Sequence, residues 1–195
     1  MRAWRFGFLG IPLLVATAVA APFMAVPIYP SGEKGATLTP ALALACGRFV
    51  MPTTILAATK MAVNITTGYG AGKKVGMAIY PDADGGTAIA NSGSLTGSST
   101  PPETAGVRTV TGLTAFDLTA GITYRVCFCA TATGGAYAAP NWTATTGFAA
   151  LQNAIVASVG RGANDCDANA TPPTTTGAIT PDTTMAPPFV LVSSE

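Results

Sequence analysis

The chain has 195 residues, of which 49% are hydrophobic and only 10% charged, and its formal net charge is +1. It contains no histidine, which excludes Ser-His-Asp and Cys-His nucleophile systems and any histidine-ligated metal. The near-neutral charge gives no electrostatic footprint for nucleic acid. The abundant apolar residues do not fit a disordered chain, and the length suits one domain with a substantial core.

Residues 1–21 have the layout of a secretory signal peptide. Arg2 and Arg5 precede an apolar stretch from Phe6 to about Ala16, and Ala18-Val19-Ala20 then offers a small-x-small cleavage pattern. The stretch is shorter than the roughly 20 apolar residues of a membrane span. The alternative is an uncleaved apolar anchor that inserts into a neighbouring subunit or into the shell of an assembly.

After this segment the sequence predicts an extended arm or linker and then a β domain. Residues 22–47, rich in Pro, Ala and Leu, form the expected arm, and residues 48–195 form the domain. Alternating or β-branched runs bounded by Gly, Pro and Asp turns predict strands. These expected strands are residues 48–52, 60–66, 75–80, 107–111, 116–118, 122–131 and 189–192.

The end of the domain has a different composition. Residues 148–160 fit either a helix or a strand, and residues 161–188 hold five prolines and are expected to form a long irregular excursion. Pro and Gly between the strands leave no crossover helices for a parallel α/β sheet. The pattern therefore predicts an all-β sandwich or barrel.

The four cysteines suggest a covalent framework rather than a metal site. Cys127 and Cys129 lie two residues apart in a predicted strand, so their side chains share a face. Their Cα atoms would be about 6.5–7 Å apart in an extended strand, which is near the upper limit for a disulfide. The better pairings join each of them to Cys46 or Cys166. Without C-x-x-C or histidine the spacing argues against zinc. We expect at least one disulfide, and the alternative is four buried free thiols.

Three runs resemble the jelly-roll β-sandwich domains of phage fibres, head decorations and receptor-binding proteins. They are FVMPTTILAATKMAVNIT, GKKVGMAIYPDADGGTAIANSGSL and FDLTAGITYRVCFC, and an F-x-L-x-x-G-x-x-Y motif falls on Phe116, Leu118, Gly121 and Tyr124. The resemblance covers roughly residues 48–132 and 188–193. It implies an all-β, jelly-roll-like antiparallel β-sandwich, here preceded by the apolar N-terminal segment.

Two pairs of carboxylates could hold Ca²⁺. Asp82 and Asp84 precede a Gly-Gly turn, and Asp165 and Asp167 flank a cysteine. The alternative for the first pair is a surface turn in which the carboxylates bond their own backbone. The alternative for the second pair is a polar loop held by a disulfide.

Two aromatic side chains are candidates for ligand binding. Tyr137 and Trp142 lie outside a clear strand, where exposed rings can stack on sugars, and the alternative is that they fold back to cap the sandwich. Glycoside hydrolysis needs two carboxyl groups across a cleft. Glu103 and Asp117 remain as possible partners, but nothing in the sequence places them together, so no enzyme is expected.

The first functional hypothesis is a non-enzymatic structural protein on the outside of an assembly, a phage virion fibre, decoration or attachment subunit. Its partners would be copies of itself, in a trimer or larger assembly, and other virion or surface proteins. A signal-like segment is unusual for a virion protein assembled in the cytoplasm. The alternative is therefore a secreted bacterial carbohydrate-binding or adhesive module, or a filament subunit that adds residues 22–47 as a strand to its neighbour. The expected location is the virion surface or the extracellular space, with no cofactor other than possible Ca²⁺.

Overall fold

A computed structural model of the chain describes residues 23–25, 33–93, 103–140, 159–182, 188 and 190–194. The signal-like segment, Trp142 and most of residues 148–160 lie outside the described residues. The regular elements of the described part are β-strands, which confirms the all-β prediction. Across these same ranges, no helix has the length and apolar character needed to span a bilayer.

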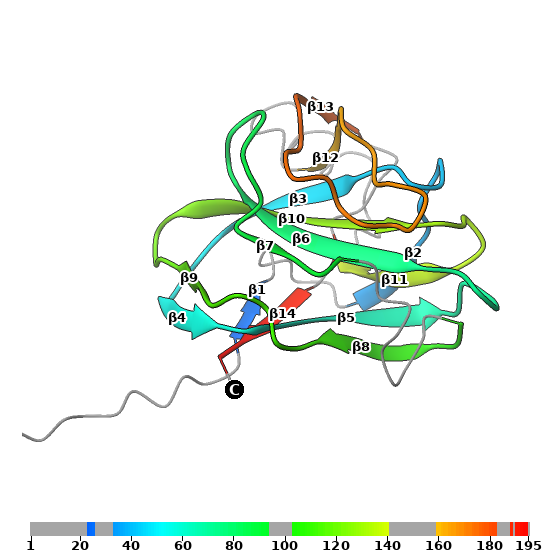
Figure 1. Ribbon diagram of the computed structural model, residues 1–195, viewed down its shortest axis with the longest axis horizontal. Coiled ribbons are helices and arrows are strands. Elements are labelled where there is room, and N and C mark those ends of the chain that lie inside the picture. The colour runs from blue at the N-terminus through cyan, green and yellow to red at the C-terminus, as the bar shows by residue number, and fades with distance from the viewer. Residues whose placement is uncertain are drawn as a thin grey trace, which may run out of the picture.

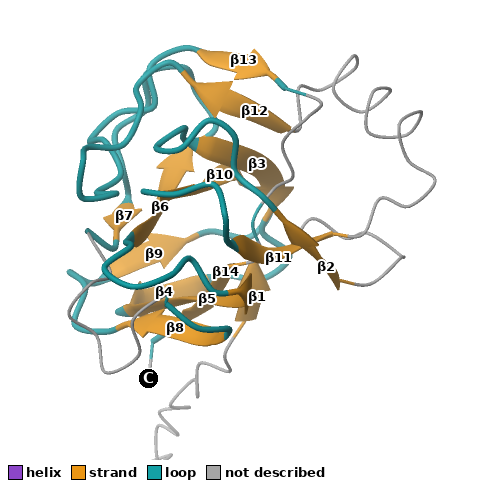
Figure 2. Cartoon of the chain, turned by 90° about the vertical axis from the view of Figure 1, so that its right-hand side faces the viewer, coloured by secondary structure: helices purple, strands orange, loops and turns teal. Residues whose placement is uncertain are grey.

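The strands form two six-stranded sheets and one small pair, all paired antiparallel (Figures 1 and 2). Sheet A contains β1 (Phe23–Ala25), β2 (Glu33–Ala36), β5 (Lys60–Thr67), β8 (Gly106–Val110), β11 (Ala136–Pro140) and β14 (Val190–Ser193). Sheet B contains β3 (Ala45–Val50), β6 (Val75–Pro81), β7 (Ala90–Asn91), β10 (Thr123–Ala130), β12 (Val159–Gly162) and β13 (Ile179–Pro181). The small pair is β4 (Ile55–Ala58) with β9 (Phe116–Leu118).

Strand β5 organises sheet A. Val63 is in register with Arg108 of β8 and with Val190 of β14, so β8 and β14 flank opposite edges of β5. Ile65 likewise pairs with Gly106 of β8 and with Tyr137 of β11. Strands β14 and β11 therefore follow one another along the same edge of β5, while β8 occupies the other.

The N-terminal arm expected over residues 22–47 is largely part of the sandwich. Strand β1 pairs with β14, β2 pairs with β11, and Ala45 already lies in β3. The chain between them buries Leu38 and Leu44 completely. Burial of a leucine contributes about 1.5–3 kcal/mol, so the apolar residues that made this region look like an arm fix it to the core instead.

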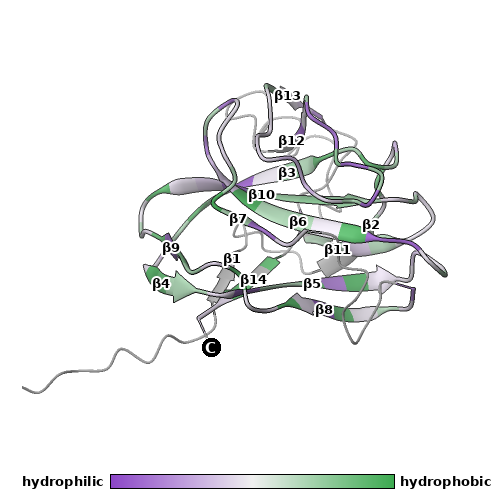
Figure 3. Ribbon diagram, in the orientation of Figure 1, coloured by the Kyte–Doolittle hydropathy of each residue, from purple (hydrophilic) through white to green (hydrophobic). Residues whose placement is uncertain are grey.

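The core lies between the two sheets. Phe128 of β10 has its ring centroid 4.6 Å from that of Tyr137 on β11 and 6.3 Å from that of Tyr69. Met77 of β6 is in register with Phe128 and is also fully buried. Hydrophobic residues run along β6 and β10 in Figure 3. This face of sheet B is the inner face, and it carries the alternate residues of β10 that the sequence placed together.

The F-x-L-x-x-G-x-x-Y motif has a clear structural reason. Phe116, Leu118 and Tyr124 are buried, and the Tyr124 hydroxyl accepts a hydrogen bond of 2.9 Å from the Thr119 backbone N–H. Gly121 turns the chain between them with φ of 77°, a region that favours glycine. The motif therefore forms a tight connection between β9 and the central strand β10.

The expected strands agree with the structure to within a few residues, but several short strands were missed. The missed elements are β1, β2, β4, β7, β11 and β13. Strand β11 reads AYAAP, and alanine has a low β propensity. Such segments become strands because they bury side chains and pair with neighbours, which no local pattern records. The expected excursion over residues 161–188 is also more regular than predicted, because β12 and β13 pair with each other.

Candidate functional site

The outer face of sheet B is covered by residues 163–177, which we call the strap. The Tyr80 hydroxyl donates to the Pro173 carbonyl oxygen at 2.6 Å, and the Asn91 amide donates to the Pro172 carbonyl oxygen at 2.8 Å. Gly76 lies directly beneath Ala170, where a Cβ would meet the Ala170 carbonyl oxygen at 2.0 Å. Because Gly76 and Tyr80 lie on the same face of β6, the strap closes this face over most of the strand.

All four cysteines are in disulfides, Cys46 with Cys127 and Cys129 with Cys166. Cys46 and Cys127 are register partners in β3 and β10, with Cα atoms 4.1 Å apart. The second bridge joins β10 to the strap. The prediction that Cys127 and Cys129 each pair outside their own strand is confirmed, and the alternative of free thiols is wrong. Two such bridges indicate an oxidising environment.

An arginine–aspartate cluster continues the same face. Arg48 of β3 and Arg125 of β10 are register partners, so two like charges lie opposite each other. The Asp82 carboxylate lies between them and forms ion pairs with the Arg48 Nη2 and, at 2.9 Å, with the Arg125 Nε. Asp84 lies 3.7 Å from Arg125 and accepts a hydrogen bond of 3.2 Å from the Ile179 N–H. The cluster therefore ties β3, β10 and β13 to the β6–β7 connection.

The second pair of candidate carboxylates also has other partners. The Asp165 carboxylate accepts from the Arg161 Nη2 at 2.9 and 3.0 Å. The Asp167 Oδ1 accepts from the Thr171 and Asn169 backbone N–H groups, both at 2.8 Å, and the hydrogen bond from Thr171 is the main cause that lowers the pKa of this carboxyl. These contacts fit the polar loop held by a disulfide.

The four candidate Ca²⁺ ligands are thus not arranged around a common point. Asp82 and Asp84 face arginines, whereas Asp165 and Asp167 face one arginine and backbone amides. Within the described ranges, no three Cys, Asp or Glu residues come together in a geometry for a metal ion.

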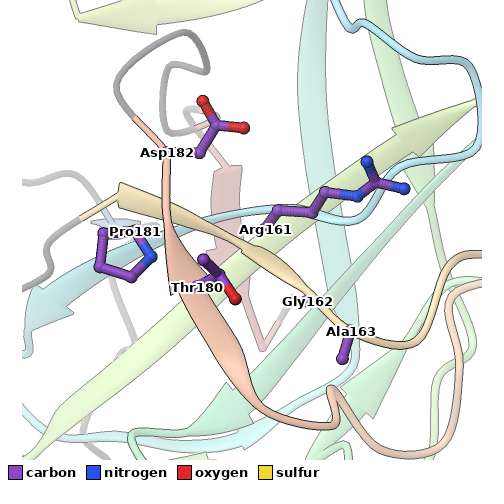
Figure 4. Close-up of a pocket in the computed structure, with 6 residues that line it drawn as sticks. All are labelled: Arg161, Gly162, Ala163, Thr180, Pro181 and Asp182. Atoms are coloured by element: carbon purple, nitrogen blue, oxygen red, sulfur yellow. The ribbon is translucent and has the colours of Figure 1, made fainter.

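A hollow of about 340 Å³ lies beside β12 and β13 (Figure 4). It is lined by Arg161, Gly162, Ala163, Thr180, Pro181 and Asp182. The Arg161 guanidinium and the Asp182 carboxylate point in different directions in Figure 4. The hollow combines the Thr180 hydroxyl and the apolar Pro181 ring with the charged Arg161 and Asp182, and it does not present two carboxyl groups to one bond.

The structure places the other predicted site residues differently. Tyr137 is fully buried against Phe128 and lies in strand β11, so it is a core residue of the sandwich, neither an exposed ligand-binding ring nor a cap folded back from a loop. Glu103 accepts from the Gly72 N–H, whereas Asp117 accepts from the Ala57 N–H. Strand β5, about 25 Å long at 3.3 Å per residue, separates these two points of the chain. The two carboxyl groups are therefore not a catalytic pair.

Sequence reasoning missed the arginines as a group. Arg48 and Arg125 acquire their role from the register of β3 and β10, which no local pattern gives. Arg108 is only 2% exposed, although it lies between two valines and a threonine in a run that predicts an ordinary strand. Arg108 is buried because it lies opposite the inward-facing Val63 of β5, and this position is known only once the pairing of β8 with β5 is known.

Searches against protein-family models, curated proteins and solved structures find no match for this chain.

Proposed function

We propose that the protein is a non-enzymatic structural subunit displayed on the outside of an assembly, of the kind that phage fibre, decoration and attachment subunits represent. The observation that carries this proposal is the outer face of β10. Arg125, Cys127 and Cys129, at alternate positions, are held by an ion pair, a disulfide to β3 and a disulfide to the strap. The polar and reactive groups of this face serve internal locking, which suits a protein that must persist outside a cell.

The composition supports the same proposal. Only 10% of the residues are charged, against roughly 25% in an average domain. Low charge reduces the repulsion between identical copies, so packing of many subunits is less costly. We therefore propose a trimer or a larger symmetric assembly, with other surface or virion proteins as further partners.

The test combines intact mass without reduction with light scattering of the native protein. Two disulfides lower the mass by about 2 Da per bridge, and the assembly is expected to have the mass of at least three copies. A monomer at micromolar concentration contradicts the structural proposal. The intact mass also distinguishes a virion protein from an exported one. A full-length chain supports the virion, whereas loss of about 20 N-terminal residues supports export.

A secreted carbohydrate-binding module is the second candidate, and the hollow beside β13 favours it. Thr180 and Pro181 line it with a hydroxyl and an apolar ring, the combination of polar and apolar groups that small-molecule sites use. Ligand-observed NMR with a panel of oligosaccharides is expected to show binding that T180V weakens. T174V changes an exposed threonine outside the hollow and is the matched control. Equal spectra with and without the panel exclude this candidate.

A further inference from the structure

Strand β8 is an edge strand of sheet A, because it pairs with β5 alone in the described part of the chain. It is also the longest edge strand that the structure describes in the two large sheets, with five residues against four in β2, three in β1 and β13, and two in β7. Its sequence, GVRTV, contains three β-branched residues and one arginine. An exposed edge of this kind presents unpaired N–H and C=O groups to any other strand.

Arg108 points from this edge into the sandwich. It is in register with Val63, and Met61 and Ile65 on the same face of β5 pair with Val110 and Gly106. Val63 and its two neighbours on this face are fully buried, and Arg108 is 2% exposed. The opposite face of β8 carries Val107, which is 52% exposed.

The Arg108 guanidinium folds back over the start of its own strand. Its Nη1 donates to the Val107 carbonyl oxygen at 3.0 Å, and its Nη2 donates to the Thr104 carbonyl oxygen and, at 3.4 Å, to the Ala105 carbonyl oxygen. Gly106 leaves room for this arrangement, because a Cβ there would lie 3.2 Å from Nη1. Within the described ranges the buried cation thus has backbone acceptors and the Thr104 hydroxyl, at 3.2 Å from Nη2, and forms no ion pair with a carboxylate.

This arrangement is costly for folding alone. The ion pairs of the described residues do not include Arg108, and its buried Nε has no hydrogen-bond partner among them. A buried charge without an opposite charge is expensive, and an apolar residue of similar size would serve the core better. Inward-pointing charges on edge strands are, however, a known protection against edge-to-edge pairing.

We propose that Arg108 closes the β8 edge to a strand from a second copy of this chain and so directs assembly to other surfaces. Its guanidinium occupies carbonyl oxygens of residues 104, 105 and 107, the kind of acceptors that an added strand needs. An added strand would also bury further a cation that forms no ion pair with any carboxylate of the described residues. Arg108 is therefore a specificity-determining residue for self-association, whichever assembly the subunit belongs to.

The test compares Arg108→Val with Arg108→Lys by sedimentation velocity over a range of concentrations. Arg108→Val removes the cation and completes a β-branched edge, and it is expected to form associates larger than the native species at protein concentrations at least tenfold lower than any at which the native protein forms them. Arg108→Lys keeps a charge at the position and is expected to sediment like the native protein. Hydrogen exchange of the Arg108→Val associate is expected to show new protection over residues 106–110.

A second substitution tests that the new contact is the β8 edge itself. Val107→Lys in the Arg108→Val background places a charge on the exposed side of the same edge and is expected to restore native sedimentation. If Arg108→Val does not fold, Arg108→Met, which keeps the long side chain, provides the comparison. A folded Arg108→Val or Arg108→Met that sediments like the native protein overturns the proposal, and so does association that Val107→Lys leaves unchanged.

Discussion

Gly76 of β6 and Ala170 of the strap are in direct backbone contact, and a Cβ on Gly76 would lie 2.0 Å from the Ala170 carbonyl oxygen. The same Cβ would lie 2.7 Å from the Pro172 Cδ. The contact lies beside the Cys129–Cys166 bridge, since Cys129 is the register partner of Gly76 and its Sγ is 3.4 Å from the Ala170 carbonyl oxygen. Glycine at this position is what lets the strap lie flat on sheet B.

Gly76→Ala is therefore expected to lift the strap and lower the free energy of unfolding by about 1–3 kcal/mol, the usual cost of overpacking. The measurement is urea unfolding of the oxidised protein. Gly134→Ala is the matched control, because a Cβ at Gly134 meets no atom within 4 Å. If both variants unfold at the same urea concentration, the strap does not pack on Gly76.

Loss of the Cys129–Cys166 bridge should free the strap without unfolding the sheets. The bridge closes a loop between residues 37 apart in sequence, so the double variant C129S/C166S is expected to lose about 4 kcal/mol on the chain-entropy model. Limited proteolysis should then cut within residues 163–177, whereas the oxidised native protein stays intact there. C46S/C127S is the comparison, because it leaves the strap bridge in place and should not expose this segment.

Removal of the Asp82 charge leaves Arg48 and Arg125 opposite each other without their shared counter-ion. Asp82→Asn is expected to cost about 2 kcal/mol, less than the roughly 3–5 kcal/mol of a fully buried pair, because the Arg48 side chain is 31% exposed. Asp117→Asn changes an exposed carboxylate whose one hydrogen bond within the described residues comes from the Ala57 backbone N–H. It should stay within about 0.5 kcal/mol of the native protein. Equal unfolding free energies for the two variants would show that the cluster is not a stabilising element.

Removal of two buried tyrosine hydroxyls is expected to affect the free energy of unfolding in different ways. The Tyr80 hydroxyl donates to the Pro173 carbonyl oxygen, so Tyr80→Phe is expected to cost about 1 kcal/mol. The Tyr69 hydroxyl is buried and has no hydrogen-bond partner within the described residues, so Tyr69→Phe should be neutral or stabilising. Denaturant unfolding near neutral pH compares them. A Tyr69→Phe variant less stable than Tyr80→Phe would contradict this assignment of the two hydroxyls.

The same tyrosines predict the alkaline limit of stability. Burial raises the pKa of both hydroxyls well above the usual range, and Tyr137 adds to the effect at Tyr69. Below the unfolded-state pKa of about 10 both tyrosines are protonated in the folded and the unfolded chain, and their contribution to the stability of the fold is fully present. Above that pH the unfolded chain releases these protons while the folded chain keeps them, so stability falls as pH rises. Unfolding midpoints between about pH 8 and pH 11 should fall less in the double variant Y69F/Y80F.

The register of β3 against β10 shows where sequence reasoning reaches its limit. Alternation in residues 122–131 correctly placed Cys127 and Cys129 on one face and favoured partners for both outside their own strand. It left open which partner each takes, because that depends on Cys46 lying opposite Cys127, a contact between residues 81 apart in sequence. Tyr137 was misjudged for the same reason, since its loop-like surroundings became a strand only through pairing with β2 and β5.

Local sequence patterns were enough to predict the fold class of this protein. Alternating apolar residues, turn-forming Gly and Asp, and the lack of histidine depend only on local chemistry, and they led to an all-β, disulfide-containing chain. Three features emerge only in the folded chain: the strap covers sheet B, Asp82 joins two arginines, and Arg108 turns inward at an edge. These features depend on contacts between residues far apart in the chain, and strand register, which local propensity leaves free, sets them.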